Sequence, residues 1–393
     1  MPWTLRMTLI ITAMTTIFLI YHYLRFSWSV RVTSLQPKKI YKRSFGLMVF
    51  LFLLYPLSGI FSHYILGDFS IDDFPRWMIW LFWYGFVFSA VMLTWMIILD
   101  VSRLIIKYAG KVKNPQLDTL FGWLTIGTMG IVLIFTAIGV MWDSNRIVIE
   151  RIDHQTESTS ALVDPLQIIH ITDLHADRFT TEKDLETYIQ KVNDENPDLI
   201  IFTGDLITSG MAHVSAGADA LRRIESTYGV YAVLGDHDYW SGEEEITQAF
   251  ADRGITMLRN ENVWIDHGNQ SIKLTGVTKI YSTSVSDEEL NGLVSEDNEE
   301  TFRILFSHQA TDDLISIGQE TGYDQLLAGH THGGQIRIPV FFQKLTASQR
   351  ESPYVIGYWW FDDMLLNINS GLGYTLAPIR YNAPAEVSVI EVN

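Results

Sequence analysis

Hydrophobic residues follow two patterns along the chain: long unbroken stretches before residue 142, and short runs separated by polar segments after residue 164. Four stretches reach the roughly 20 residues that a helix needs to cross a bilayer. They are 7–24, 45–66, 77–99 and 120–142. The last three contain no Asp, Glu, Lys or Arg, and tryptophans lie near the ends of the last two, as interfacial aromatics do. The pattern predicts four transmembrane helices.

Beyond residue 164, short strand-like runs alternate with amphipathic helical patterns and are then followed by strands in succession. This order predicts a layered α/β sandwich rather than a barrel. The expected organisation is a four-helix membrane anchor, a juxtamembrane linker and one α/β domain, at 1–142, 143–163 and 164–393.

Five polar blocks each follow an apolar, strand-like run in this second part of the chain. In order, the residues with ligand chemistry are Asp173, His175, Asp205, Asp236, His237, His308, His330 and His332. Ligand sites of open α/β sheets form beyond the carboxyl ends of the strands, so the five blocks are expected to converge. Imidazole and carboxylate together suit divalent transition metals, and this number of ligands is enough for two ions.

Charge and cysteine content restrict the partners. Residues 1–142 hold 12 Lys/Arg against 5 Asp/Glu, whereas residues 143–393 hold 16 against 40, for a net charge of −17. The acidic second part argues against a nucleic-acid substrate, because binding to a phosphate backbone needs a basic surface. The chain has no cysteine, which excludes disulfides, thiolate ligands and cysteine nucleophiles. No protein partner is evident.

The basic residues between the spans predict the orientation of the chain. The first connection is rich in them, with Arg25, Arg31, Lys38, Lys39, Lys42 and Arg43, and the third carries Arg103, Lys107, Lys111 and Lys113. The second has only Arg76, beside Asp68, Asp72 and Asp73. By the positive-inside rule, both termini and the α/β domain lie outside the cytoplasm. We therefore expect an integral membrane protein whose α/β domain lies on the outer, periplasmic or extracellular side of the membrane. Only His22 and His63 are ionisable near the spans, which favours an anchor over a transporter.

Two cations held about 3.5–4 Å apart can activate water and stabilise both the entering and the leaving oxygen of a phosphoester. A bridging carboxylate is the natural way to hold them that close. Asp205, which follows Gly204 at the end of its strand, is the candidate for this bridge.

The blocks ITDLHAD, FTGDL, LGDHDYW, FSHQ and AGHTHGGQ resemble the motifs of the calcineurin-like metallophosphoesterases, over roughly 160–393. The stretch 370–386 is also similar to a bacterial branch with membrane-associated members. The resemblance implies two metal subsites that share Asp205. The first would comprise Asp173, His175, Asp205 and His332, and the second Asp205, Asp236, His308 and His330. It also implies that His237 contacts the substrate phosphate.

Thr208 stands where purple acid phosphatases carry a tyrosine ligand. The resemblance therefore favours two divalent ions, Mn²⁺ first, with Zn²⁺, Fe²⁺ and Mg²⁺ as alternatives. The family's asparagine in the third block is Asp236 here. We expect Asp236 to bind metal and its charge to favour a protonated His237. A catalytically degenerate site is the competing hypothesis.

Other residues have less specific interpretations. His170 is expected to be a packed or supporting histidine, and Asp238 either an orienting or a simple structural residue. Tyr239 and Trp240 either line the pocket or pack. We expect His154, His213 and His267 at the surface, Arg380 in a structural role, Gly333 and Gly334 in a turn, and the acidic stretch 286–300 as a solvated loop.

These observations together predict a membrane-anchored dinuclear-metal phosphohydrolase. Its expected substrate is an envelope or lipid-linked phosphoester, cleaved as a phosphodiester or a pyrophosphate. The alternative is a membrane sensor or scaffold with the same fold and no turnover.

Overall fold

A computed structural model of the chain describes residues 3–67, 70–109, 115–155, 162, 164–295 and 301–393. The chain divides into two compact units. The helical unit comprises Met1–Ser144, Ile336–Leu345 and Leu376–Asn382, and the sheet unit comprises Asn145–Gln335, Thr346–Thr375 and Ala383–Asn393. Some of the expectations above rest partly on residues outside the described ranges. These residues are Asp68, Lys111, Lys113 and 296–300.

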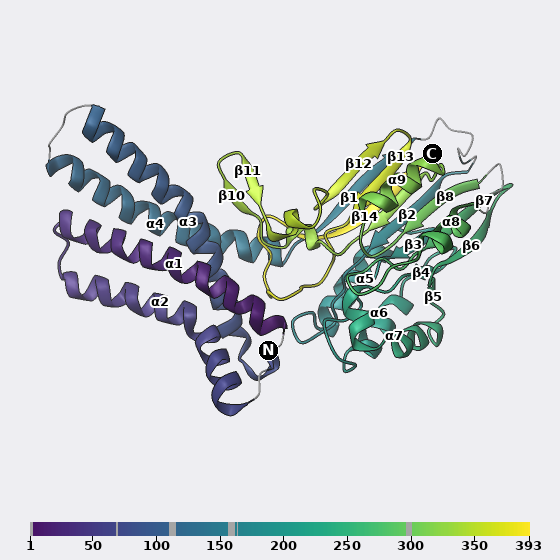
Figure 1. Cartoon of the computed structure of the whole chain (residues 1–393), viewed down its shortest axis with the longest axis horizontal. Helices are drawn as coiled ribbons and strands as arrows, with labels where there is room; N and C mark the ends of the chain where they lie inside the picture. Colours follow the sequence, from purple (N-terminus) through teal and green to yellow (C-terminus); the bar gives the residue numbers. More distant parts are fainter. Residues whose placement is uncertain (1–2, 68–69, 110–114, 156–161, 163, 296–300) are drawn as a thin grey trace. The chain divides into compact units, whose positions relative to one another are not determined.

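The helical unit contains four long helices (Figure 1): α1 (Trp3–Val32), α2 (Lys38–Phe61), α3 (Arg76–Ala109) and α4 (Pro115–Ser144). A short π-helix (Ser62–Leu66) and a 3₁₀ turn (Ile71–Asp73) follow α2. All four helices are long and apolar enough to cross a membrane, which confirms the prediction from hydropathy. They exceed the predicted spans because helical structure continues into the charged residues that flank them.

Ion pairs join three helices at one end of the bundle. Arg25 of α1 contacts Asp100 of α3 at 2.6 Å, and Arg103 of α3 contacts Asp118 of α4 at 2.6 Å. The ring of Trp28 is contacted by both guanidinium groups, 4.4 and 4.5 Å from its centroid. Cation–π contacts and partly buried ion pairs of this kind fix the relative positions of the helices that carry them.

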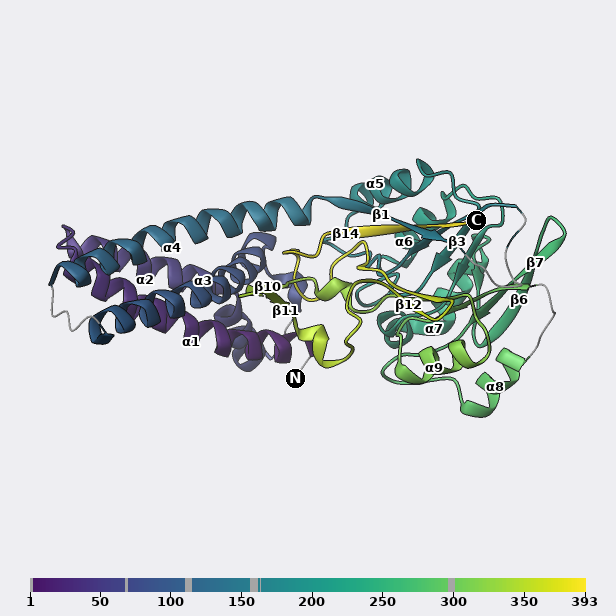
Figure 2. The ribbon, with the colours of Figure 1, turned by 90° about the horizontal axis from the view of Figure 1, so that it is seen from above.

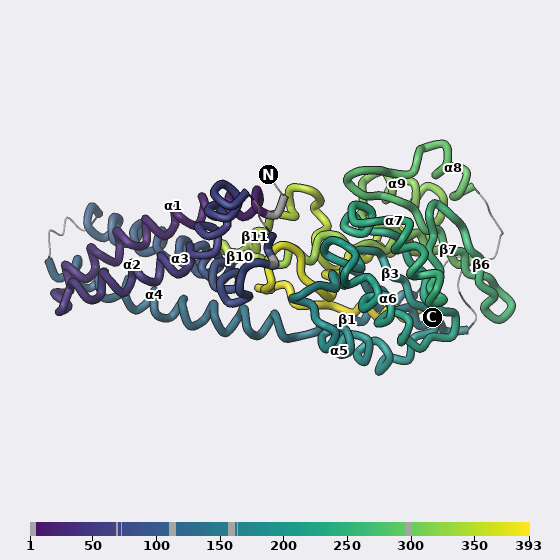
Figure 3. The backbone as a smooth tube through the Cα atoms, turned by 90° about the horizontal axis from the view of Figure 1, so that it is seen from below, coloured from purple at the N-terminus to yellow at the C-terminus, as the bar shows by residue number. Residues whose placement is uncertain are grey.

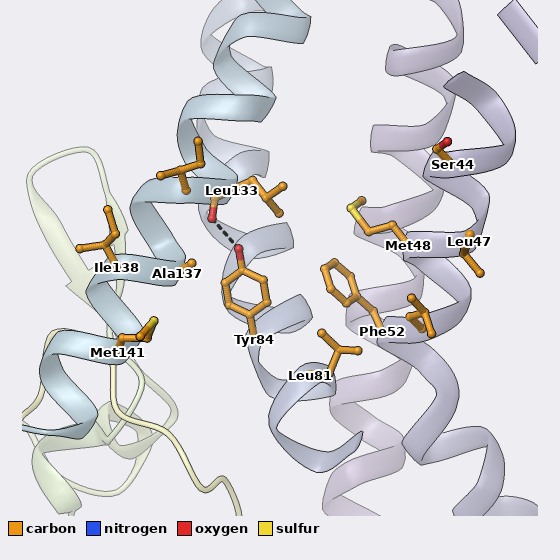
Figure 4. A pocket seen from close by; sticks show the side chains of 12 residues that line it. Ser44, Leu47, Met48, Phe52, Leu81, Tyr84, Leu133, Ala137, Ile138 and Met141 are labelled. Carbon is orange, nitrogen blue, oxygen red and sulfur yellow. Dashed lines mark hydrogen bonds between the residues drawn. The ribbon is translucent and has the colours of Figure 1, made fainter. Parts of the chain in front are cut away.

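An apolar cavity of about 560 Å³ lies among α2, α3 and α4 (Figure 4). Phe52 and Met48 of α2 line it opposite Ile138 of α4. The Tyr84 hydroxyl donates a hydrogen bond of 2.5 Å to the Leu133 carbonyl, which satisfies the polar end of this ring in an otherwise apolar setting.

Two segments distant in sequence fold with these helices. The strands β10 (Ile338–Val340) and β11 (Gln343–Leu345) form an antiparallel hairpin, and β10 packs against α3. In the second segment, the Asn382 N–H donates to Asp143 Oδ2 at 2.6 Å. A Cβ at Gly139 would lie 2.8 Å from the ring of Tyr381, so this glycine permits close packing of that ring on α4.

The sheet unit contains two six-stranded sheets (Figures 2 and 3). The first has the order β1 (Ile147–His154), β14 (Ala385–Val392), β2 (Leu166–Ile171), β3 (Leu199–Phe202), β4 (Val230–Ala232), β5 (Thr256–Met257). The second has the order β12 (Gly357–Phe361), β13 (Met364–Ile368), β9 (Gln325–Ala328), β8 (Thr301–Phe306), β7 (Gln270–Gly276), β6 (Glu261–His267). The pairs β14–β2, β12–β13 and β6–β7 are antiparallel, and the other pairs are parallel.

The sheets pack face to face and helices cover their outer faces. Buried residues of both sheets, among them Ile168 and Phe302, form one core between them. The helices α5 (Glu182–Asn193), α6 (Val214–Arg222) and α7 (Asp236–Ala251) cover the first sheet, and α8 (Asp287–Ser295) and α9 (Asp312–Glu320) cover the second. This four-layer arrangement confirms the predicted layered α/β sandwich.

The helix after the third polar block, α7, begins within that block at Asp236 and kinks at Gly242, where φ is 157°. One local expectation was wrong. The acidic stretch is not a loop over residues 287–295 but the helix α8. Its Leu290 and Val294 are buried, because their spacing of four residues places both on the face toward the second sheet.

Candidate metal centre

The seven predicted ligands follow the carboxyl ends of five strands. Asp173 and His175 follow β2, Asp205 follows β3 and Asp236 follows β4, all in the first sheet. The other three ligands are on the second sheet: His308 follows β8, and His330 and His332 follow β9. The loops therefore converge from two sheets, whereas the sequence argument assumed the edge of one.

A first cluster consists of Asp173, His175, Asp205 and His332, all buried. His332 Nε2 lies 3.1 Å from Asp173 Oδ1 and 3.0 Å from His175 Nε2. His175 Nε2 lies 3.4 Å from Asp205 Oδ2. Two carboxylates and two imidazoles thus direct their donor atoms at one another.

A second cluster consists of Asp236, His308 and His330. His330 Nδ1 lies 3.1 Å from Asp236 Oδ2 and 3.3 Å from His308 Nε2, and His308 Nε2 lies 3.5 Å from Asp236 Oδ2. Asp236 therefore directs a carboxylate oxygen at both histidines, in the manner of a ligand.

Asp205 lies between the two clusters. Its Oδ2 is 3.4 Å from Nε2 of His175 in the first cluster and 3.4 Å from Nε2 of His308 in the second. Its Oδ1 accepts the backbone N–H of His237 at 2.9 Å, which fixes the orientation of the carboxylate. The geometry thus gives this side chain the central position expected of a bridging ligand.

The donor set fits divalent cations. Asp173 Oδ2 accepts hydrogen bonds from the Thr172 hydroxyl and the His330 N–H, whereas its buried Oδ1 accepts none and faces the imidazole nitrogens. Burial by itself would lower the pKa of His175, but hydrogen bonds and charge from Asp173 and Asp205 raise it to about 9. Burial would raise the pKa of Asp205, but His308 and His237 hold it well below its usual range. Buried carboxylates in this arrangement attract positive charge, which bound metal ions supply.

The backbone of the site is strained. Five of the seven ligands have positive φ: Asp173 (52°), His175 (44°), Asp205 (57°), His330 (69°) and His332 (52°). Such conformations cost energy for residues with a Cβ and concentrate at functional sites. Gly204 (φ 94°) and Gly235 lie against each other here, and a Cβ on Gly235 would clash with Asp205 Oδ1. The two glycines allow the loops after β3 and β4 to approach closely.

Supporting hydrogen bonds orient the ligands of the second cluster. Asp236 Oδ1 accepts the Tyr281 N–H at 2.7 Å, and its Oδ2 accepts from the Gln309 amide at 2.7 Å. The Nδ1 atom of His308 lies 2.8 Å from the Thr203 carbonyl, so this nitrogen carries the proton and Nε2 faces the cluster.

The outward side of His330 contacts two polar side chains. Its Nε2 lies 3.2 Å from Glu351 Oε2 and 3.1 Å from the Tyr281 hydroxyl. The hydrogen bond from His330 lowers the pKa of Glu351. A carboxylate on the outer nitrogen of a metal-binding imidazole fixes its tautomer and increases its basicity.

His170 and Asp238 support the site from behind. The Nδ1 and Nε2 atoms of buried His170 lie 2.6 Å from Asn367 Oδ1 and 2.9 Å from Thr203 Oγ1, which agrees with the expected supporting role. Asp238 accepts the Leu206 N–H at 2.9 Å, which orients the loop after Asp205. Burial and the nearby Asp205 raise the pKa of Asp238 to about 7.

His237 borders the first cluster. Its ring lies 4.9 Å from that of His175, and its Nδ1 donates to the Thr208 carbonyl at 2.5 Å. Burial lowers the pKa of His237, and the positive neighbours His175 and His308 lower it further against the opposing effect of Asp205. Asp236 is not among the groups that most shift the pKa of His237, so the expectation that its charge favours a protonated His237 stays a prediction. Asp236 directs its charge at His308 and His330 instead.

Aromatic rings lie beside the site. Trp240 is 52% exposed and Tyr281 57% exposed. Their planes are nearly parallel, at 8° with centroids 6.5 Å apart. Trp240 also lies 5.5 Å from His237, and Tyr281 lies 5.0 Å from His330. Of the two interpretations of Trp240, its exposure favours lining the approach to the site over packing.

Two histidines expected at the surface are buried. His154 is fully buried and its Nδ1 lies 2.9 Å from Gln325 Nε2. His267 contacts the Tyr228 hydroxyl at 2.9 Å. The polar sequence around each gave a misleading signal, because both residues end edge strands whose alternate positions face the interior. His213, also expected at the surface, is partly buried, and Arg380 is buried. Gly333 and Gly334 have positive φ in a turn, as expected.

Three residues that contact the two clusters were not predicted: Gln309, Tyr281 and Glu351. Gln309 directly follows a ligand, and this adjacency was a usable signal. Tyr281 and Glu351 lie in polar loops without a preceding ligand motif, and only the folding of those loops brings them to the site.

The sequence model of the calcineurin-like phosphoesterase family matches residues 166–334. An uncharacterized metallophosphoesterase of Bacillus subtilis, YkuE, is 30% identical over 234 residues, which cover 58% of this chain and 78% of that protein. The phosphodiesterase YaeI of Escherichia coli is 28% identical over 58% of this chain and 82% of its own. A transmembrane protein with metallophosphoesterase domain from Danio rerio is 20% identical over 89% of this chain and 80% of its own.

Proposed function

Because this chain belongs to the calcineurin-like phosphoesterase family and is a phosphoester hydrolase, we propose that it cleaves phosphodiester or pyrophosphate bonds of an envelope or lipid-linked substrate. The central position of Asp205, 3.4 Å from one histidine of each cluster, is the observation that carries this proposal. It supports a pair of metal ions that share one carboxylate.

Asp173, His175, Asp205 and His332 would hold the first ion, and Asp205, Asp236, His308 and His330 the second. Two divalent cations there supply activation of water and neutralisation of phosphoryl charge. Mn²⁺ is the first candidate, because the ligands are imidazoles and carboxylates without thiolate or tyrosinate.

His237 would act on the substrate. With Nδ1 donating to the Thr208 carbonyl, its Nε2 donates only when the ring is protonated. A phosphoryl group beside the ring brings negative charge, raises the pKa of His237 and favours the imidazolium. The ring can then donate from Nε2 to a phosphoryl or leaving oxygen. His237 would thus be neutral in the free protein and become protonated when substrate binds. A group with this behaviour can act as a general acid.

The helices support an envelope location for the substrate. Four candidate spans imply contact with a bilayer, and the apolar cavity among α2, α3 and α4 is suited to hydrocarbon. The distribution of basic residues supports a sheet unit on the periplasmic or extracellular side of a bacterial inner or plasma membrane.

The test uses the full chain in proteoliposomes with Mn²⁺, bis(p-nitrophenyl) phosphate and then extracted envelope lipids. We expect turnover of the chromogenic diester, its loss in Asp205→Ala, and release of a phosphorylated head group from a lipid fraction. Bound manganese without any turnover would instead favour the sensor or scaffold. Activity that arises only in Asp236→Asn would identify a degenerate site.

A further inference from the structure

The tip of the β10–β11 hairpin exposes two adjacent phenylalanines. Phe341 is 69% exposed and Phe342 is 103% exposed, and Leu345 beyond them is 44% exposed. Phe341 also has a positive φ of 53°, a costly conformation for an aromatic residue. Two bulky apolar side chains at the end of a tight hairpin are unfavourable in water, because their apolar surface stays hydrated.

The hairpin belongs to the unit that contains the candidate membrane spans. Its strand β10 packs against α3. Within this unit it projects from the side of the bundle, level with the last turns of α4 (Figures 1 and 2). Those turns expose Ile138 (61%), Met141 (60%) and Trp142 (64%), an apolar surface that ends in an aromatic residue of the interfacial type. The hairpin tip and the last turns of α4 thus both expose large apolar side chains within the helical unit.

We propose that Phe341 and Phe342 insert into the bilayer that the four helices cross, at the interface where α4 ends. The occupant of this surface is lipid, because the hairpin belongs to a unit whose four helices are long and apolar enough to cross a bilayer, and hydrocarbon covers the exposed apolar side chains of such a bundle. Gln343 and Lys344, exposed on the strand that follows, place polar groups at head-group level.

Both ends of the hairpin lead into the metal centre. His332 precedes Ile338 by six residues, and Glu351 follows Leu345 by six residues. Insertion of the tip into lipid therefore tethers two loops to the bilayer. One loop carries His332, and the other carries Glu351, which contacts His330.

The absence of cysteine in the chain makes a clean test possible. A single cysteine is introduced as Phe342→Cys, labelled with an environment-sensitive nitrobenzoxadiazole dye and reconstituted in phosphatidylethanolamine–phosphatidylglycerol vesicles. Quenching is measured with doxyl-labelled phosphatidylcholine and with aqueous iodide. Ile131→Cys, 68% exposed on α4, is the lipid-facing control, and Glu288→Cys on α8 is the water-facing control.

We expect the label at position 342 to show blue-shifted emission. We expect the doxyl lipid to quench it as strongly as it quenches the label at position 131, and iodide to quench it little. Quenching by iodide to the extent seen at position 288, without quenching by the lipid, would overturn the proposal. Phe341→Cys repeats the measurement at the neighbouring position, so misfolding of one variant does not leave the question open. The measurement reports the position of the label and not hydrolysis, so the result does not depend on whether the chain hydrolyses a lipid.

Discussion

His330 Nε2 lies 3.2 Å from Glu351 Oε2, while the Nδ1 of the same ring faces the second cluster. The carboxylate thus holds His330 in the tautomer that leaves Nδ1 unprotonated for a metal ion. Glu351 is a positioning residue in this arrangement, and the Tyr281 hydroxyl shares the contact.

Removing the charge of Glu351 should weaken the second metal subsite. In Glu351→Gln, we expect the affinity of the second subsite to fall by about 10–100-fold, because loss of such an outer partner reduces ligand basicity. Titration calorimetry with Mn²⁺ measures this directly. Glu320→Gln, an exposed residue at the end of α9, is the matched control and should bind as the native protein does. Unchanged affinity for both ions in Glu351→Gln would refute the positioning role.

Because the loops after β3 and β4 approach closely, we expect a single methyl group added at Gly235 to abolish metal binding. In Gly235→Ala, the added Cβ would clash with Asp205 Oδ1 and displace the shared carboxylate. We expect loss of bound metal and of diester hydrolysis while the circular dichroism spectrum is retained. Gly292→Ala on α8 meets nothing within 4 Å and should leave metal content unchanged. Two ions per chain in Gly235→Ala would show that the approach is not required.

His154 should make the sheet unit less stable in acid. Burial lowers the pKa of His154 to about 4 in the folded protein, below the usual 6.5, so the unfolded chain binds the proton more tightly. Its contribution to stability is therefore present above pH 6.5 and is lost as the pH falls from about 6.5 to about 4, by roughly 3 kcal/mol.

The measurement is thermal unfolding in detergent of the native chain and His154→Gln across this pH range. We expect the variant to lose less stability than the native chain between pH 6.5 and 4. Parallel pH profiles would mean that His154 does not titrate between the folded and unfolded states.

The basic connections predict that the sheet unit lies outside the cytoplasm. A membrane-impermeant maleimide should label Glu288→Cys in intact spheroplasts, and should label Lys107→Cys only after permeabilisation, because Lys107 lies in the third connection. The reverse pattern would place the unit in the cytoplasm.

The local features of this protein were predictable because their signals are contiguous in the chain. A candidate span is recognised by its uninterrupted apolar length, and a strand-end motif by a short apolar run followed by polar residues. The helices and the residues of the two clusters could therefore be named from the sequence. The acidic helix α8 was missed because its charged residues obscure the spacing of Leu290 and Val294.

The sequence by itself determined the types and the order of the candidate ligands and the length of the apolar helices. Only the tertiary structure decided that the ligand loops come from two sheets, that Glu351 reaches His330, and that the β10–β11 hairpin packs with the helices. These contacts join segments far apart in the chain. They depend on how buried faces pack against one another, and the hydrophobic pattern of a single segment does not indicate that packing.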